Sequence, residues 1–261
     1  MTVATTNPTR SNESTEKALA IMELLAGKPA PMRLLDIARE LQLNTSTVAR
    51  FLSSLQSCGY VAQEPETQRY YLTYKICRIA NQVSARTSMQ TITHPLLIEL
   101  SETFGEAICV SVEQDLTMVY VDVANTQNQM LLSIQRVGNT TPMHCTGNGK
   151  LLLTEFTPEK LTRYIEIRGL GRYTDNTITT RYALEAELEA IRQRGYAVDN
   201  EEREIGVRCL AYPIRDYTGA IIAGISVTGP STRMTDQAIE AYRPRLADVA
   251  HRVSVALGYA S

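Results

Sequence analysis

The chain is poor in the side chains that build metal centres and covalent frameworks. Its five cysteines are scattered and include no CxxC pair, and none of its three histidines stands four residues from another metal-binding side chain. A dispersed, odd set of cysteines argues against a disulfide framework and against structural zinc. We therefore expect free thiols, no metal site and no cofactor.

Long apolar runs are also absent. No run approaches the roughly 18 residues of a membrane span, and the polar N-terminal stretch lacks the apolar core of a signal peptide. Residues 1–13 are typical of a disordered tail. The 261 residues, 44% of them hydrophobic, suffice for two globular domains, and we expect a cytoplasmic protein without membrane contact.

Strong charge of either sign is lacking too, since the formal net charge is −2. Residues 1–80 hold nine basic and seven acidic side chains, a net charge of +2, and the rest of the chain carries −4. The positive sign of this N-terminal charge suits a DNA-binding half, but its small size predicts few phosphate contacts per subunit. Useful affinity would then require a dimer that reads two half-sites.

The most informative segment that is present is residues 44–57. Val48, Phe51, Leu52 and Leu55 stand at i, i+3, i+4 and i+7, which predicts one apolar face of a helix. Hydroxyls and a guanidinium, which donate hydrogen bonds to phosphates and base edges, occupy the other face without any carboxylate. The side chains expected to contact DNA are Thr45, Ser46, Thr47, Arg50 and Ser54.

The neighbouring segments place this helix in a larger motif. The same apolar spacing recurs over 34–41 and 18–25, and only residues 42–44 separate the second helix from the third. Downstream, β-prone residues 60–62 and 69–72 flank a polar turn containing proline, which predicts a hairpin. Three helices and a hairpin predict a winged helix-turn-helix, with Arg69 as a candidate phosphate contact in the wing.

Beyond the hairpin the pattern predicts helices, then strands in hairpins with helices added, hence an α+β domain. We expect a linker helix from Tyr74, with Pro95 interrupting it and a second helix starting there. Strands are expected at 107–113, 117–124, 129–134, 207–215 and 220–228. Helices are expected after the turn at 146–149, at 158–168, at 181–194 and from 235 to 257, the last one strained by Pro244.

Two short motifs allow more than one interpretation. Residues 146–150 are not a P-loop, because His144 stands where the first glycine belongs and Leu151 where Ser or Thr belongs. They indicate either a tight turn before a packed helix or a helix N-terminus that approaches a ligand. The charged run 199–204 indicates a solvated loop or an acidic side chain that accepts hydrogen bonds from a ligand.

These separated motifs together resemble the IclR family of bacterial transcription regulators. The resemblance spans roughly residues 14–258. It rests on LLDIARELQLNTSTVARFLSSLQSCGYV, RYYLTYKI, PMHCTGNGKLLL, DNEEREIGVRCLAYPI and AGISVTGP. It implies a winged helix-turn-helix (14–73), a linker helix (74–93) and a GAF-like effector-binding domain (94–261). It also implies palindromic operator DNA as partner and a homodimer or homotetramer.

Carried over position by position, the resemblance implies a pocket for a small metabolite. Its residues would be Ser133, Thr141, Gly147, Asn148, Asp199, Val207, Cys209, Ser226 and Thr228. Asn148 stands where a small apolar residue is common, and Thr228 where serine is common. This set contains no Arg or Lys. For a small organic acid we therefore expect the backbone amides of 146–149 to hold the carboxylate and Asp199 to accept hydrogen bonds from hydroxyls.

The predicted function is thus an IclR-type transcriptional regulator, repressor or activator, whose operator affinity is controlled by a small organic acid. The alternative is an enzyme acting on a small metabolite with an appended helix-turn-helix. Cys209 as nucleophile and His144 as base would be its candidate pair. No oriented third member is evident and Cys209 stands in an apolar strand, so we assign no catalytic residue.

Overall fold

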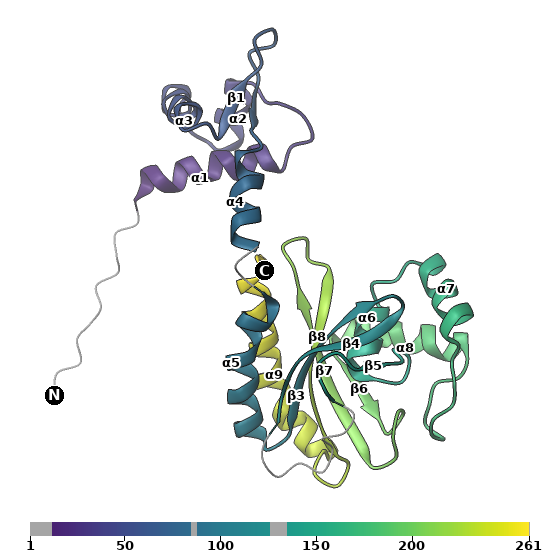
Figure 1. The fold of residues 1–261 in the computed structure, drawn as a ribbon. Coiled ribbons are helices and arrows are strands. Elements are labelled where there is room, and N and C mark those ends of the chain that lie inside the picture. The colour runs from purple at the N-terminus through teal and green to yellow at the C-terminus, as the bar shows by residue number, and fades with distance from the viewer. Residues whose placement is uncertain (1–11, 85–87, 126–134, 261) are drawn as a thin grey trace, which may run out of the picture. The chain divides into compact units, whose positions relative to one another are not determined.

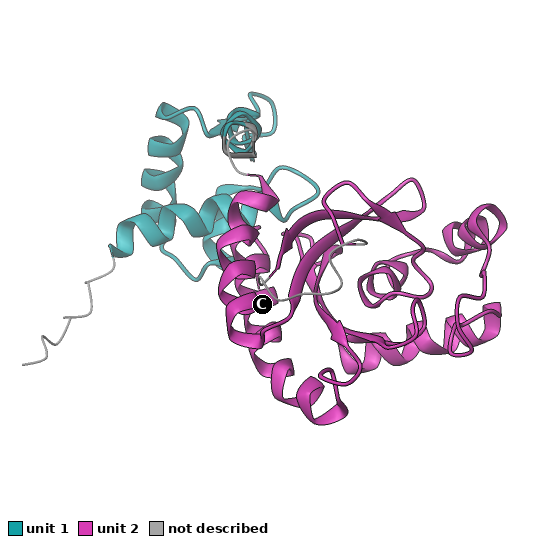
Figure 2. Ribbon diagram, turned by 60° about the horizontal axis from the view of Figure 1, so that its bottom comes forward, with its two compact units in different colours: residues 1–86 teal, residues 87–261 magenta. Residues whose placement is uncertain are grey.

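The computed structural model describes residues 12–84, 88–125 and 135–260. It divides into two compact units, residues 1–86 and residues 87–261, which Figure 2 shows in different colours. Residues 1–11 of the predicted tail, the predicted strand 129–134 and Ser133 lie outside the described residues. Among the helices of the described segments, none combines the length and the hydropathy that crossing a bilayer demands.

Three helices around one apolar core make up the first part of the N-terminal unit. They are α1 (Glu13–Ala26), α2 (Leu34–Glu40) and α3 (Thr45–Ser57). The four apolar residues predicted for α3 are all buried and pack with Ile21 of α1 and Ile37 of α2. Asn44 is the N-cap residue of α3, but its side chain makes no capping hydrogen bond. The predicted three-helix arrangement is therefore confirmed.

A two-stranded wing follows α3. Strand β1 (Val61–Gln63) pairs antiparallel with β2 (Tyr70–Leu72), and Val61 lies opposite Leu72. The backbone of Met32 also exchanges hydrogen bonds with that of Tyr70, at 3.0 and 2.7 Å. This bridge fastens the α1–α2 connection to the wing, and the sequence pattern did not predict it.

The position of the next helix break differs from the prediction. Helix α4 spans Lys75–Ser84, and α5 spans Met89–Phe104 with Pro95 inside it. The expected break at Pro95 is therefore wrong. The Oγ atom of Ser88 accepts a hydrogen bond from the Thr91 amide at 3.1 Å and caps α5 at an earlier point. Pro95 removes a single helical N–H donor, and packing of α5 on the sheet outweighs that loss.

A six-stranded antiparallel sheet forms the centre of the second unit. Its strands are β3 (Ala107–Gln114), β4 (Thr117–Ala124), β5 (Thr140–Thr141), β6 (Ala197–Asn200), β7 (Val207–Arg215) and β8 (Ile221–Pro230). They lie in the order β5-β4-β3-β8-β7-β6. The central pair, β3 and β8, joins segments more than 100 residues apart, with Cys109 opposite Ser226.

Helices cover both faces of this sheet (Figure 1). Helices α5 and α9 (Asp236–Ala256) lie together against one face. Helix α6 (Gly147–Leu153) packs on the other face, and α7 (Pro158–Arg168) and α8 (Arg181–Arg194) share its apolar core. Alternation along β3 sends Ile108 and Val110 into the α5/α9 core and Cys109 into the α6 core. This is the predicted α+β class, and Pro244 lies inside α9 as expected.

Strand β6, like the two-residue strand β5, was not predicted by the sequence pattern. Its residues Asp199 and Asn200 pair with Cys209 and Arg208 of β7, so the start of the charged run 199–204 belongs to the sheet. Asp199 is 5% exposed. The interpretation of a fully solvated loop is therefore wrong at Asp199, whereas Glu204 and Ile205 are exposed.

Candidate functional site

The polar face of α3 is open to solvent within the N-terminal unit. Thr45, Ser46, Arg50 and Ser54 are exposed and Thr47 is half-buried. The Ser54 hydroxyl donates to the carbonyl oxygen of Arg50 at 3.1 Å, so its proton already takes part in a hydrogen bond within the helix. Arg50 lies with its guanidinium carbon 5.3 Å from the centre of the Phe51 ring, and no carboxylate stands on this helix. The face can therefore donate to phosphates and base edges.

The wing presents a different surface. Arg69, directly before β2, is half-buried, and its Nη1 donates to the carbonyl oxygen of Pro31 at 3.3 Å. Glu64 and Glu66 stand in the turn between the strands. One edge of the Arg69 guanidinium thus holds the wing to the α1–α2 connection, and the tip carries negative charge.

A cavity of about 60 Å³ lies in the second unit between the sheet and α6. Eight of the nine residues predicted for the effector pocket line it, namely Thr141, Gly147, Asn148, Asp199, Val207, Cys209, Ser226 and Thr228. Seven further lining residues stand outside the predicted set, although the backbone of one of them, Thr146, was expected to contact the effector. They are Cys109, Met118, Tyr120, Gln135, Thr146, Arg203 and Glu204. They come from β3, β4, the β6–β7 loop and the segments around β5 and the start of α6.

Asn148 ties α6 to the sheet. Its Nδ2 donates to the hydroxyls of Ser111 at 3.2 Å and Ser226 at 3.1 Å. Its Oδ1 lies so close to Gly224 that a Cβ atom there would stand 2.6 Å from it. Both ends of the amide therefore face β3 and β8. The asparagine therefore fixes α6, on one side of the cavity, to strands β3 and β8 on the other side.

The glycines at the start of α6 allow the chain to approach itself. A Cβ atom at Gly149 would stand 2.4 Å from the Met143 Cα, and one at Gly147 would stand 3.0 Å from the Cys209 Sγ. Gly149 therefore serves the tight turn, one of the two interpretations left open above. Gly147 both lines the cavity and lets α6 pack on β7.

Asp199 has a perturbed carboxyl group. Its Oδ1 accepts the Glu202 amide proton at 2.8 Å. Burial, and after it the charge of Glu202, raises the pKa of Asp199 to about 7. At neutral pH this carboxyl is divided between its charged and neutral forms, so it can donate as well as accept a hydrogen bond.

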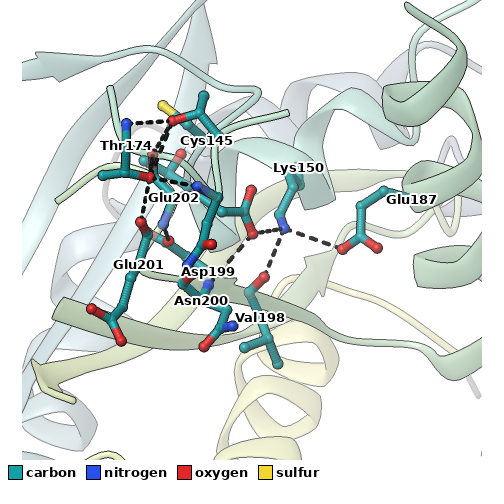
Figure 3. A network of polar contacts seen from close by, with 12 residues as sticks. Cys145, Lys150, Thr174, Glu187, Val198, Asp199, Asn200, Glu201 and Glu202 are labelled. Atoms are coloured by element: carbon teal, nitrogen blue, oxygen red, sulfur yellow. Dashed lines mark hydrogen bonds and ion pairs between the residues drawn. The ribbon is translucent and has the colours of Figure 1, made fainter. Parts of the chain in front are cut away.

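A buried lysine lies beside the segment that carries Asp199 and Glu202 (Figure 3). The Nζ atom of Lys150 contacts Oε1 of Glu202 at 2.5 Å, the carbonyl oxygen of Val198 at 2.7 Å and Oε1 of Glu187 at 3.1 Å. Lys150 is 1% exposed. The network connects α6, α8, β6 and the β6–β7 loop, and so holds the elements around the cavity together.

Arg203 is the functional candidate that sequence reasoning missed. The predicted pocket set contains no cation, yet Arg203 lines the cavity with its guanidinium carbon 4.1 Å from the centre of the Tyr173 ring. Its position inside the charged run 199–204 was the available signal. The pattern did not show which charges of that run turn inward.

The candidate catalytic pair has no supporting geometry. Within the described residues, no hydrogen bond joins Cys209 to His144, whose ring nitrogens contact the Tyr164 hydroxyl at 3.1 Å and the Gly171 carbonyl oxygen at 3.0 Å. Burial, and after it the charge of Asp199, raises the pKa of the Cys209 thiol to about 11. A thiol protonated at neutral pH is a poor nucleophile.

An exposed hydroxyl-and-arginine helix in a winged helix-turn-helix, followed by an α+β domain whose cavity is lined by both polar and apolar side chains, defines a DNA-binding regulator with a ligand-binding domain. The IclR helix-turn-helix domain matches residues 14–65, and the bacterial transcriptional regulator IclR C-terminal domain matches residues 81–255. The chain belongs to the IclR family of transcriptional regulators, as its sequence motifs predicted.

Individual relatives agree with this assignment. The chain is 34% identical over 239 residues to the HTH-type transcriptional regulator BhcR of Paracoccus denitrificans, covering 92% of this chain and 85% of BhcR. It is 30% identical over 249 residues to the regulator KdgR of Escherichia coli, covering 95% and 94%. The crystal structure of the Thermotoga maritima IclR matches with a TM-score of 0.61 and 32% identity, covering 94% and 99%. These relatives are named as regulators and not as enzymes, which is consistent with a regulator rather than an enzyme.

Proposed function

We propose that a small organic acid, bound in the cavity beneath α6, controls the affinity of this regulator for its operator DNA. The observation that carries the proposal is the cavity itself, with hydroxyl, thiol and carboxyl groups from all six strands of the sheet around a small space. A volume of about 60 Å³ exceeds the roughly 10–15 Å³ that one water needs, and it suits a compound of a few non-hydrogen atoms.

The DNA contacts follow from the exposed face of α3. Arg50 reads a base edge or a phosphate, and the hydroxyls of Thr45, Ser46 and Thr47 support it in the major groove. Ser54 and Arg69 have the lesser role of contacting the flanking backbone, since each already donates to a carbonyl oxygen. The effector acts by favouring one spacing of two winged helices over another.

The operator is a palindrome and the regulator a cytoplasmic homodimer or homotetramer. Support comes from apolar side chains that the monomer leaves uncovered in the N-terminal unit, namely Leu19 on α1, Ile79 on α4 and Tyr74 before it. The small positive charge of residues 1–80 points the same way, because one copy offers few phosphate contacts.

A gel-shift experiment tests the proposal. The full chain is titrated onto DNA from upstream of its own gene, with and without short hydroxy and keto acids. The expected result is a specific complex whose affinity changes at least about fivefold with one of these acids, the lower end of usual coupling energies. Specific DNA binding that responds only to neutral or cationic compounds would contradict the proposed class of effector.

A further inference from the structure

Arg203 holds a charge without a counter-ion at the wall of the cavity. Within the described residues its guanidinium takes part in no salt bridge, and its Nε atom is buried without any hydrogen-bond partner. A buried, unsatisfied donor on a cation is costly, and native structures rarely keep one unless something else completes it. The Gln135 Oε1 atom, also on the cavity wall, is buried without a partner as well.

The loop that carries Arg203 is held in place from several sides. The Glu201 carboxylate accepts the Gly206 amide proton at 2.6 Å, and the Asp199 carboxylate accepts that of Glu202 at 2.8 Å. The hydroxyls of Thr174 and Thr177 donate to the backbone carbonyls of Glu201 and Glu202, at 2.7 and 2.6 Å. The guanidinium is therefore presented by a rigid loop and clamped on one face by Tyr173. Stacking leaves its in-plane N–H groups available.

We propose that Arg203 is the effector-binding residue that pairs with a carboxylate, and that it restricts the effector to small monocarboxylates. This inference rests on the proposed function and adds a residue and a charge rule to it. A guanidinium matches a carboxylate through two parallel hydrogen bonds. It replaces the backbone amides at the start of α6 as the main anion partner.

The limit to one carboxylate follows from the other charges at the wall. Among the described residues that line the cavity, Arg203 is the one cation, and Asp199 and Glu204 are the acids. A second carboxylate would lie unpaired near Asp199, and an unpaired buried anion is strongly disfavoured. A hydroxyl or carbonyl group on the effector instead suits Gln135, Ser226 and Thr228.

Calorimetric titration of the full chain with matched probes tests this assignment. The monocarboxylates are glycolate, lactate and pyruvate. Each is compared with its neutral amide and with the dicarboxylate that adds one carboxyl group, namely tartronate, malate and oxaloacetate. For wild type we expect at least one monocarboxylate to bind roughly 30-fold or more tightly than its amide, the size of a desolvated charge pair. The dicarboxylate should bind more weakly than the monocarboxylate.

Three variants locate the effect. Arg203→Gln should weaken binding of that acid by about 30-fold or more and bring the ratio of acid to amide affinity close to one. Arg203→Lys keeps the positive charge but loses the two parallel N–H donors of the guanidinium, so its affinity for the acid should lie between those of wild type and Arg203→Gln. If Arg203→Gln does not fold, the comparison of Arg203→Lys with wild type tests the assignment. Arg172→Gln removes an exposed arginine that pairs with Asp175 and does not line the cavity, and this variant should bind like wild type.

The outcomes separate the two proposals. If wild type binds an acid and Arg203→Gln binds it equally well with the same preference over the amide, the assignment of Arg203 is wrong and the organic-acid effector stands. A dicarboxylate that binds best overturns the charge rule. If none of the acids binds wild type, both the effector class and the role of Arg203 are contradicted.

Discussion

Lys150 on α6 and Glu202 on the β6–β7 loop form an ion pair from which water is almost excluded, with side chains that are 1% and 8% exposed. The net attraction within such a pair adds little to the free energy of unfolding, but removing one partner is strongly destabilising because it leaves the other charge buried and unpaired. Because Arg203 follows Glu202 directly, the same contact fixes the loop that carries the proposed effector residue.

Breaking this pair from one side should destabilise the protein strongly. Lys150→Met leaves the Glu202 carboxylate buried and unpaired, and we expect a loss of about 3–5 kcal/mol in the free energy of unfolding. The double variant Lys150→Met/Glu202→Gln should recover part of it. Urea unfolding followed by circular dichroism measures both. Equal free energies of unfolding for Lys150→Met and wild type would show that the Lys150 network does not stabilise the protein.

Asp199 should make stability depend on pH. Its pKa is about 7 when folded, against 3.8 ordinarily, so between these values the folded chain holds a proton that the unfolded chain has lost. Stability from this group is therefore present at low pH, falls as pH rises from about 4 to 7, and levels off above, with a slope of at most about 1.4 kcal/mol per pH unit.

Asp199→Asn keeps an oxygen for the Glu202 amide and should flatten that slope. Unfolding free energies at pH 5.5 and pH 8 should differ less in this variant than in wild type. Asp175→Asn, at a fully exposed carboxylate, is the matched control and should retain the wild-type dependence. Parallel curves for Asp199→Asn and wild type would contradict the raised pKa.

Gly149 should tolerate no side chain. An added Cβ would stand 2.4 Å from the Met143 backbone, so Gly149→Ala must push α6 away from the segment before it and should cost at least about 1–3 kcal/mol. Gly171→Ala is the control, since a Cβ there meets nothing nearer than 3.9 Å. Thermal denaturation should show a lower melting temperature for the first variant alone.

Arg50 should carry a large share of operator affinity. Arg50→Ala is expected to cost about 1–3 kcal/mol if the guanidinium reads a base edge through two hydrogen bonds. Arg50→Lys distinguishes a base contact from a phosphate contact, because lysine can still contact a phosphate but cannot make the two parallel hydrogen bonds to a base edge. Fluorescence anisotropy with operator and with scrambled DNA, at several salt concentrations, measures the effect. Unchanged operator affinity in Arg50→Ala would remove α3 from the role of recognition helix.

The uncovered apolar residues of the N-terminal unit should belong to a subunit interface. Sedimentation at micromolar concentration should show no dominant monomer. Leu19→Glu with Ile79→Glu should shift the protein towards monomer, because buried like charges would face each other across a two-fold interface. Ile167→Glu, which replaces an exposed apolar residue on α7 of the second unit, should leave assembly unchanged. A wild-type monomer that protects one short asymmetric site would contradict this assignment.

Periodicity allowed most of the elements to be predicted, and failed where long-range contacts decide. The apolar stripe of α3 and the bounds of α7 and α8 follow from local spacing, which the helix alone determines. Strand β6 was missed because the burial of Asp199 depends on β7 as a partner, and the helix break near Pro95 was misplaced because the cap at Ser88 outweighs one lost N–H. The cavity residues came from family motifs, and Arg203 was missed because its inward position depends on Tyr173 and the Thr174–Glu201 contact.

The pairing of β3 with β8 imposes an order on synthesis. Residues 12–84 make mostly local contacts, so the helix-turn-helix can fold as soon as it leaves the ribosome. Strand β3 must wait for a partner 117 residues later, roughly ten seconds at bacterial rates of elongation. Until then its edge is unpaired and open to aggregation. A premature stop between residues 85 and 220 would therefore leave the helix-turn-helix without a complete sensor domain, whereas loss of residues 1–86 would spare the sensor domain.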